Sequence, residues 1–170
     1  MSMRELTREE RTKVNRALDR WGAFDFFSDK TLLVDGDSKN VCLISSALEP
    51  IAGLIKPEHA GLVIGELKKT FTPSMPGADL FARNAKSNRF YVELTESAAQ
   101  LVLYGRDVMG NSIISAWEGL DENELVILFD SKRDAIGIGR TRFAGKSLLQ
   151  KGKITISTVA DAGLYLREEG

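Results

Sequence analysis

The segment from Ala135 to Arg142 reads Ala-Ile-Gly-Ile-Gly-Arg-Thr-Arg, a glycine-punctuated apolar run that ends in two arginines. A short apolar run of this kind predicts a β-strand. In a strand, Arg140 and Arg142 are two residues apart and share a face. The segment lies within a basic island of seven lysines and arginines that contains the single acid Asp134. The basic members are Lys132, Arg133, Arg140, Arg142, Lys146, Lys151 and Lys153.

Further strand-like runs flank this segment, at spacings of about 8–12 residues that favour a small barrel or sandwich. They are Val108, Ile113-Ile114, Leu125 to Phe129 and Ile154 to Thr158. A short helix over Ser97 to Leu103 precedes them. After Thr95 the sequence pattern changes to closely spaced short strand-like runs. We therefore expect one domain over residues 1–94 and a second over residues 95–170.

The N-terminal half mixes helices and strands. Thr7 and Glu10 form a plausible capping box, and apolar residues then recur with helical spacing as far as Trp21, before Gly22. Strands are predicted over Thr31 to Asp35, Val41 to Ser45, Leu62 to Leu67 and Phe90 to Leu94. Short helices are predicted after Ser46 and over Asp79 to Ala85, the latter after a break at Pro73, Pro76 and Gly77. The loops are too short for repeated parallel crossovers, so the fold class is α+β with an N-terminal antiparallel sheet.

The opposite face of the first helix is basic. A solvated helix face is the simplest interpretation of this pattern. Its residues are Arg8, Arg11, Lys13, Arg16 and Arg20.

Composition limits the classes of function. The chain has 170 residues, is 43% hydrophobic and 28% charged, and carries a formal charge of −1. A polyanion must therefore be bound by a local patch. Cys42 is the only cysteine, which excludes an internal disulfide and a cysteine-rich zinc site. No stretch approaches the ~20 apolar residues needed to cross a bilayer, so we expect a cytoplasmic protein that contacts no membrane.

No constellation of catalytic residues is visible. His59 is the only histidine, and neither it nor Cys42 has a recognisable supporting group. Cys42 lies between Val41 and Leu43 in a predicted strand, where a buried structural role is favoured. The sequence therefore predicts no enzyme, no metal site and no cofactor.

Nucleic-acid binding is better supported by the basic island. Arg140, Arg142, Lys146, Lys151 and Lys153 would lie on two strands and on the loop that joins them. Thr155 and Ser157 alternate with isoleucines, which predicts a polar face on the second strand. Aromatic side chains that could stack on an unpaired base are Tyr104, Phe143 and Tyr165. Charge clustering alone leaves an ordinary solvated surface as an equal alternative.

Three segments resemble, in order and spacing, the PUA domain, a small RNA-binding pseudobarrel. They are Tyr104-Gly105-Arg106-Asp107-Val108, the strand Ala135 to Arg142, and the ending Ala160 to Glu169. The whole chain is similar to the Nip-seven family of large-subunit ribosome-biogenesis factors, whose opening pattern matches Arg4-Glu5-Leu6-Thr7-Arg8-Glu9-Glu10.

The resemblance implies where RNA binds. RNA would lie against the loop after the short helix, at Gly105 with Arg106 beside it and Tyr104 before it. Arg140, Arg142 and Lys146 would contact phosphates. The chain departs from the family at Ser147-Leu148-Leu149, where relatives tend to carry a basic pair, and Lys151 and Lys153 stand near that gap.

The expected function is therefore a non-enzymatic RNA-binding protein of large-subunit assembly. Its partners would be pre-rRNA and ribosome assembly proteins, and a monomer is favoured. Two alternatives stay open: an accessory subunit that delivers RNA to a modifying enzyme, and a protein-interaction module that binds an acidic partner.

Overall fold

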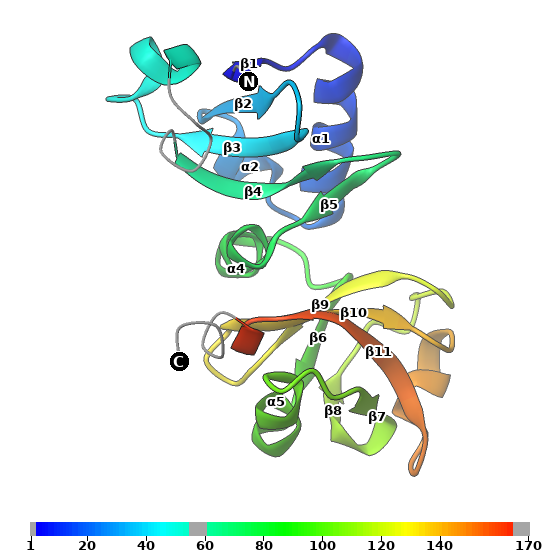
Figure 1. The fold of residues 1–170 in the computed structure, drawn as a ribbon. Helices are drawn as coiled ribbons and strands as arrows, with labels where there is room; N and C mark the ends of the chain where they lie inside the picture. Colours follow the sequence, from blue (N-terminus) through cyan, green and yellow to red (C-terminus); the bar gives the residue numbers. More distant parts are fainter. Residues whose placement is uncertain (1–2, 55–60, 165–170) are drawn as a thin grey trace. The chain divides into compact units, whose positions relative to one another are not determined.

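The computed structural model describes residues 3–54 and 61–164, except the side chains of residues 52 and 53. The chain divides into two compact units, Met1–Lys86 and Ser87–Gly170, and each is built around its own sheet (Figure 1). This division precedes the boundary expected near Thr95. The strand β6 (Tyr91–Leu94) accounts for the difference, because it pairs with two strands of the second sheet.

The first unit contains a five-stranded antiparallel sheet in the order β1-β2-β3-β4-β5, and an antiparallel sheet is what the sequence predicts here. The strands β2, β3 and β4 fall on the predicted runs, whereas β1 and β5 were not anticipated. A strand of three residues carries too few positions to show an alternation. The strands are β1 (Met3–Glu5), β2 (Thr31–Asp35), β3 (Asn40–Ile44), β4 (Gly61–Leu67) and β5 (Phe71–Pro73).

The helix α1 (Arg8–Arg20) begins at the predicted capping box. The Thr7 hydroxyl accepts a hydrogen bond from the Glu10 amide at 3.2 Å, and the Glu10 carboxylate accepts one from the Thr7 amide at 3.0 Å. The same carboxylate forms an ion pair with Arg4, whose Nη1 lies 2.6 Å from Glu10 Oε1. These donors, Arg4 above all, lower the pKa of Glu10 from 4.5 to about 2. The apolar side of α1, including Val14 and Leu18, is buried.

Two further helical segments differ from the predictions. The helix α4 (Met75–Asn84) starts ahead of the expected position, because Ser74 caps it and Pro76 is tolerated in its first turn. A Cβ on Gly77 would lie 1.9 Å from the Ile64 carbonyl oxygen, so this glycine permits close packing on β4. The segment after Ser46 forms a 3₁₀ turn, η1 (Glu49–Leu54), in place of an α-helix. The short helix α2 (Phe24–Phe27) was not predicted.

Cys42 is fully buried with Met3 and Ile44 on the face of the sheet where Leu48 packs, as expected for a structural cysteine. His59, by contrast, lies outside the described residues, as does the ending from Tyr165 to Glu169.

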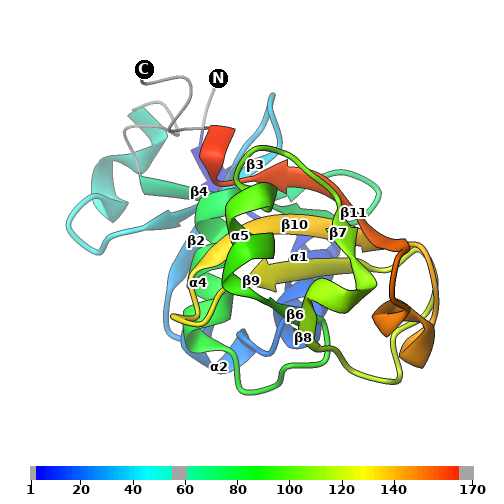
Figure 2. The same ribbon diagram turned by 90° about the horizontal axis from the view of Figure 1, so that it is seen from below.

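The second unit contains a six-stranded sheet that curls into a pseudobarrel, in the order β7-β11-β10-β9-β6-β8 (Figures 1 and 2). Only the β6–β9 pair is parallel among the described strands. The remaining strands are β7 (Val108–Met109), β8 (Ile113–Ser115), β9 (Leu125–Phe129), β10 (Ala135–Thr141) and β11 (Ile154–Asp161). The helical segments are α5 (Glu96–Val102), η2 (Gly110–Ser112) and η3 (Gly145–Leu149).

The glycines of β10 allow this sheet to close around its core. A Cβ on Gly137 would lie 2.8 Å from the Val102 side chain of α5, and one on Gly139 would lie 2.5 Å from the Ile156 side chain of β11. Both distances are shorter than ordinary contact. The segment that predicts a strand therefore also lets α5 and β11 pack closely against β10.

Candidate nucleic-acid interface

The loop that follows α5 is shaped by Gly105. This residue has φ +78°, a left-handed conformation that glycine adopts without strain. Its amide donates a hydrogen bond to the Val102 carbonyl at 2.8 Å. Tyr104 is 71% exposed beside it, and Gly105 and Arg106 are exposed as well. The loop thus presents an aromatic ring, an accessible backbone and a cation together.

The loop is fixed to β11 at two points. The Thr158 hydroxyl donates to the Arg106 carbonyl at 2.8 Å, and the Asp107 carboxylate accepts the Thr158 amide at 2.9 Å. Pairing of β7 with β11 brings these residues together although they are far apart in sequence.

Arg142 joins this cluster from the end of β10. Its Nε donates to the Ser157 hydroxyl at 2.6 Å, and its Nη2 lies 3.3 Å from an Asp107 carboxylate oxygen. Since the Arg142 side chain remains 46% exposed, it can still present donors to a ligand. The structure therefore brings Arg142 beside the loop of Tyr104, Gly105 and Arg106.

Arg140 is exposed on β10, but its side chain extends toward the β9 side of the strand and not toward β11. Its Nη1 donates to the Asn123 carbonyl at 3.0 Å, in the turn that precedes β9. The two arginines therefore do not form one tight cluster, even though two-residue spacing gives them a common face.

The lysines of the island lie farther along the chain, in η3 and the turn before β11. Lys146 Nζ lies 3.9 Å from a Glu118 oxygen, and both side chains are largely exposed, so this pair is weak. Lys153 Nζ lies 5.8 Å from the centre of the Phe143 ring, and Lys151 is exposed in the same turn. Phe143 is thereby covered by a cation and partly buried.

The expected polar face of β11 is wrong at Thr155. This side chain is fully buried, and its hydroxyl donates to the Leu148 carbonyl at 2.7 Å. Ile154 is 39% exposed instead. The register of β11 against β7 shifts between Ile154 and Ile156, which breaks the simple alternation. Ser157 keeps its expected place, where it accepts from Arg142.

Asp107 belongs to this cluster although no binding role was predicted for it from the sequence. It contacts both Arg142 and the Thr158 backbone, through pairings that span more than thirty residues of chain. In the sequence, an aspartate near basic residues indicates only that charges are balanced. The contacts of Asp107 with Arg142 and Thr158 become visible only when β7, β11 and β10 pair in the sheet.

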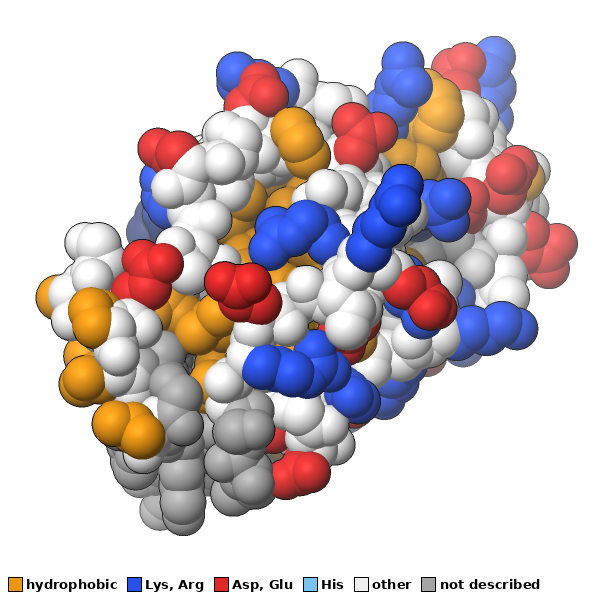
Figure 3. Space-filling model, turned by 90° about the horizontal axis from the view of Figure 1, so that it is seen from above, with side chains coloured by type: hydrophobic (Ala, Val, Ile, Leu, Met, Phe, Trp, Pro, Cys, Tyr) orange, Lys and Arg blue, Asp and Glu red, His pale blue; other side chains and the backbone are white. Residues whose placement is uncertain are grey.

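The basic side of α1 is a different kind of surface. Arg8, Arg11 and Arg16 are exposed, Lys13 lies 3.5 Å from Glu9, and the Arg20 guanidinium lies over Trp21. Figure 3 shows one face of the molecule, on which basic side chains are interspersed with acidic ones. The exposed arginines of α1 and its Glu9–Lys13 pair are typical of a solvated helix face.

Within the described residues, no group of three histidine, cysteine, aspartate or glutamate side chains is close enough to hold a metal ion. The described helices are also all too short or too polar to span a bilayer. The chemistry that the interface offers is the donation of hydrogen bonds and positive charge, with one exposed aromatic ring.

Comparisons with known proteins agree with this architecture. Residues 3–75 match the family model of the NIP7/UPF0113 pre-PUA domain, and residues 90–170 match that of the UPF0113 PUA domain. A UPF0113 protein of Archaeoglobus fulgidus is 34% identical over 172 aligned residues, which cover 99% of this chain and 97% of that protein.

Solved structures share the fold at lower identity. A conserved PUA domain protein of Thermoplasma acidophilum superposes with a TM-score of 0.68 at 16% identity, over 99% of both chains. A hypothetical protein of Pyrococcus horikoshii gives 0.66 at 17% identity, over 94% of both chains. The two family models and the 34% identical relative show that the chain belongs to the NIP7/UPF0113 family, with a pre-PUA domain followed by a PUA domain.

Proposed function

We propose that this protein binds RNA through the surface formed by the Tyr104–Asp107 loop and the basic side chains of β10 and of the segment that follows it, and that it carries out no chemical step itself. The RNA would be a single-stranded or irregular segment of pre-rRNA. The first unit would contact protein partners of the assembling large ribosomal subunit, in the cytoplasm. Membership of a PUA-domain family supports RNA as the class of ligand.

The observation that carries the proposal is the fixed position of the loop. Two hydrogen bonds to Thr158 and the Asp107–Arg142 pair hold the exposed backbone at Gly105 beside a guanidinium and the Tyr104 ring. Guanidinium groups suit phosphate oxygens, and an exposed aromatic ring can stack on an unpaired base. Such phosphate contacts position the RNA, whereas base contacts supply any sequence preference.

The test is RNA affinity as a function of salt concentration. With five phosphate contacts, from Arg140, Arg142, Lys146, Lys151 and Lys153, we expect a log–log slope of roughly −3 to −4 for single-stranded RNA. Replacing Arg140 and Arg142 together with alanine should lower the affinity and reduce the magnitude of the slope by about 1.4, because two contacts are lost.

A matched control removes two charges from the first unit, by Lys68→Ala and Lys69→Ala. Both lysines are exposed at the turn between β4 and β5. This variant should keep the affinity and slope of the native protein. If the arginine pair behaves like the lysine control, the assigned surface is wrong.

The RNA itself is identified by crosslinking in cells and sequencing of the bound fragments. Fragments of pre-rRNA, together with co-purified assembly proteins, are the expected result. Enrichment of a modification enzyme and its substrate RNA would instead contradict the assembly role and identify an RNA-delivery subunit.

A further inference from the structure

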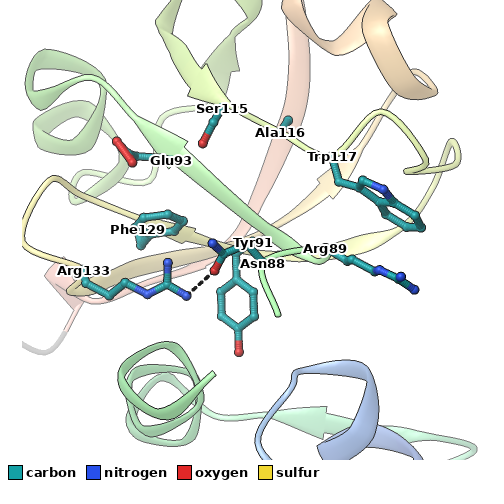
Figure 4. Close-up of a pocket in the computed structure, with 9 residues that line it drawn as sticks. All are labelled: Asn88, Arg89, Tyr91, Glu93, Ser115, Ala116, Trp117, Phe129 and Arg133. Atoms are coloured by element: carbon teal, nitrogen blue, oxygen red, sulfur yellow. Dashed lines mark hydrogen bonds between the residues drawn. The ribbon is translucent and has the colours of Figure 1, made fainter. Parts of the chain in front are cut away.

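A hollow of about 420 Å³ lies in the second unit (Figure 4). It is lined by β6 and the residues that precede it, by the segment from the end of β8 to Trp117, and by the end of β9 with the turn that follows. All of its lining residues belong to this unit; Arg133 alone among them is a member of the basic island, and none belongs to the Tyr104–Asp107 loop. Its aromatic members include Tyr91, Trp117 and Phe129, and its cations are Arg89 and Arg133.

Guanidinium groups lie over aromatic rings on two sides of this hollow. The Arg133 guanidinium lies 4.6 Å from the centre of the Phe129 ring and 5.3 Å from that of Tyr91. It also donates to the Asn88 side-chain oxygen at 2.6 Å, which fixes its plane. On the other side, the Arg89 guanidinium lies 5.2 Å from the centre of the Trp117 ring.

The Trp117 side chain is packed against its neighbours but is still partly exposed to solvent. Its ring meets Phe90 edge-on at 5.8 Å, and a Cβ on Gly119 would lie 2.3 Å from the indole. Nevertheless 38% of the residue remains exposed. An exposed indole beside guanidinium groups offers flat faces for stacking, and it loses little entropy when a ligand binds because its neighbours already fix it.

The polar groups that line the hollow include one carboxylate, that of Glu93. Glu93 of β6 and Ser115 of β8 are paired across their two strands and project from the sheet at the margin of the hollow in Figure 4. A carboxylate accepts hydrogen bonds from the amino groups of adenine, guanine or cytosine, whereas uracil has no amino group and its single N3–H donor lies between two carbonyl oxygens that repel the carboxylate. Two guanidinium groups against one lining carboxylate leave the site positively charged, which suits a ligand that carries phosphate.

We propose that this hollow holds an unpaired, amino-bearing base of the bound RNA, stacked on the Arg89–Trp117 layer with its phosphate near a guanidinium. This inference rests on the proposed RNA-binding function and extends the RNA beyond the Tyr104–Asp107 loop. An acidic peptide would use the cations but would gain nothing from the flat stacking faces, so a base fits the observations better.

The test compares three substitutions in the full chain, with labelled single-stranded RNA followed by fluorescence anisotropy. Trp117→Leu removes the π-face and should weaken binding about tenfold, the usual scale for one base stack. Trp117→Phe keeps a π-face and should lose much less. Phe24→Leu is the matched control, because Phe24 is an exposed aromatic of the first unit (43% exposed) and should have no effect.

A second measurement follows Trp117 itself. In a Trp21→Phe background Trp117 is the only tryptophan, and RNA should quench its fluorescence. Oligo(A) should quench more strongly than oligo(U), and Glu93→Gln should reduce this difference. Far-ultraviolet circular dichroism confirms that each variant is folded.

The outcomes separate the two proposals. RNA binding that is weakened by the Arg140/Arg142 double variant but is equal in Trp117→Leu and the native protein would overturn the base site and leave the proposed function standing. Absence of RNA binding by the native protein would overturn both. Quenching by free nucleotides or by an acidic peptide, but not by RNA, would overturn the assignment to an RNA base.

Discussion

The hydroxyl of Thr155 lies fully inside the second unit and donates to the Leu148 carbonyl at the end of η3. At the scale of single residues, such buried polar pairs decide positions that hydrophobic alternation cannot. Asp107 and Thr158 form a partly buried polar pair between the loop after α5 and β11. In both cases a polar side chain stabilises an irregular segment against a regular strand.

Thr155→Val tests the first of these pairs. Valine has nearly the same shape but leaves the Leu148 carbonyl without its buried donor, so we expect a loss of about 1–3 kcal/mol in the free energy of unfolding. The measurement is urea denaturation. Thr155→Ser keeps the hydroxyl and should lose less stability, and a valine variant as stable as the native protein would show that this hydrogen bond contributes nothing net.

At the scale of secondary-structure elements, the ends of α1 and the packing of β10 are the informative features. The capping box and Arg4 fix where α1 begins, through groups that are close in sequence. The glycines of β10 instead act through α5 and β11, which are distant in sequence.

Glu10→Gln tests the start of α1 as a function of pH. The folded-state pKa of Glu10, about 2, is below its ordinary 4.5, so its contribution to stability is complete above pH 4.5 and is lost as the pH falls toward 2. We expect the variant to be about 1 kcal/mol less stable at neutral pH, with the difference vanishing in acid.

The matched control for this change is Glu9→Gln in the same helical turn, where the carboxylate is 82% exposed. Denaturation midpoints measured at several pH values compare the two variants. A pH dependence in Glu10→Gln equal to that of the native protein would contradict the assignment.

Gly137→Ala tests the packing of β10. The added Cβ would meet the Val102 side chain and, at 2.9 Å, the Ala160 carbonyl oxygen. Because the backbone of β11 cannot easily retreat, we expect a loss of about 1–3 kcal/mol, measured by chemical denaturation. Arg140→Ala, at an exposed position of the same strand, should change stability by less than about 0.5 kcal/mol. Equal stability of the two variants would refute the packing argument.

At the scale of the whole molecule, the chain is nearly neutral, and a local excess of positive charge lies in the basic island. The chain has 23 basic and 24 acidic residues, so binding of a polyanion depends on where these charges lie and on which of them are paired. The Asp107–Arg142 and Glu118–Lys146 pairs partly neutralise the basic island, whereas the exposed Arg106 extends it. The salt dependence of RNA binding is the property that reports this arrangement.

Much of the fold could be read from local patterns. The capping box at Thr7, the helical spacing of Val14 and Leu18 and the apolar runs at β2, β9 and β10 each depend on residues that are neighbours in the chain. The same holds for the family resemblance, which rests on short segments whose order and spacing are visible in sequence. These features were predicted because the interactions behind them are local.

The sequence by itself therefore determined most of the longer helices and strands, the α+β class and the family, and it located the basic island. Only the tertiary structure decided that β6 joins the second sheet, that Thr155 is buried, that Arg140 and Arg142 reach in opposite directions, and that Arg133 lies over Phe129. Each of these depends on strand pairing, register and side-chain partners that are distant in the chain. Such contacts leave no periodic signal in one sequence, because any of several strands could have supplied the partner.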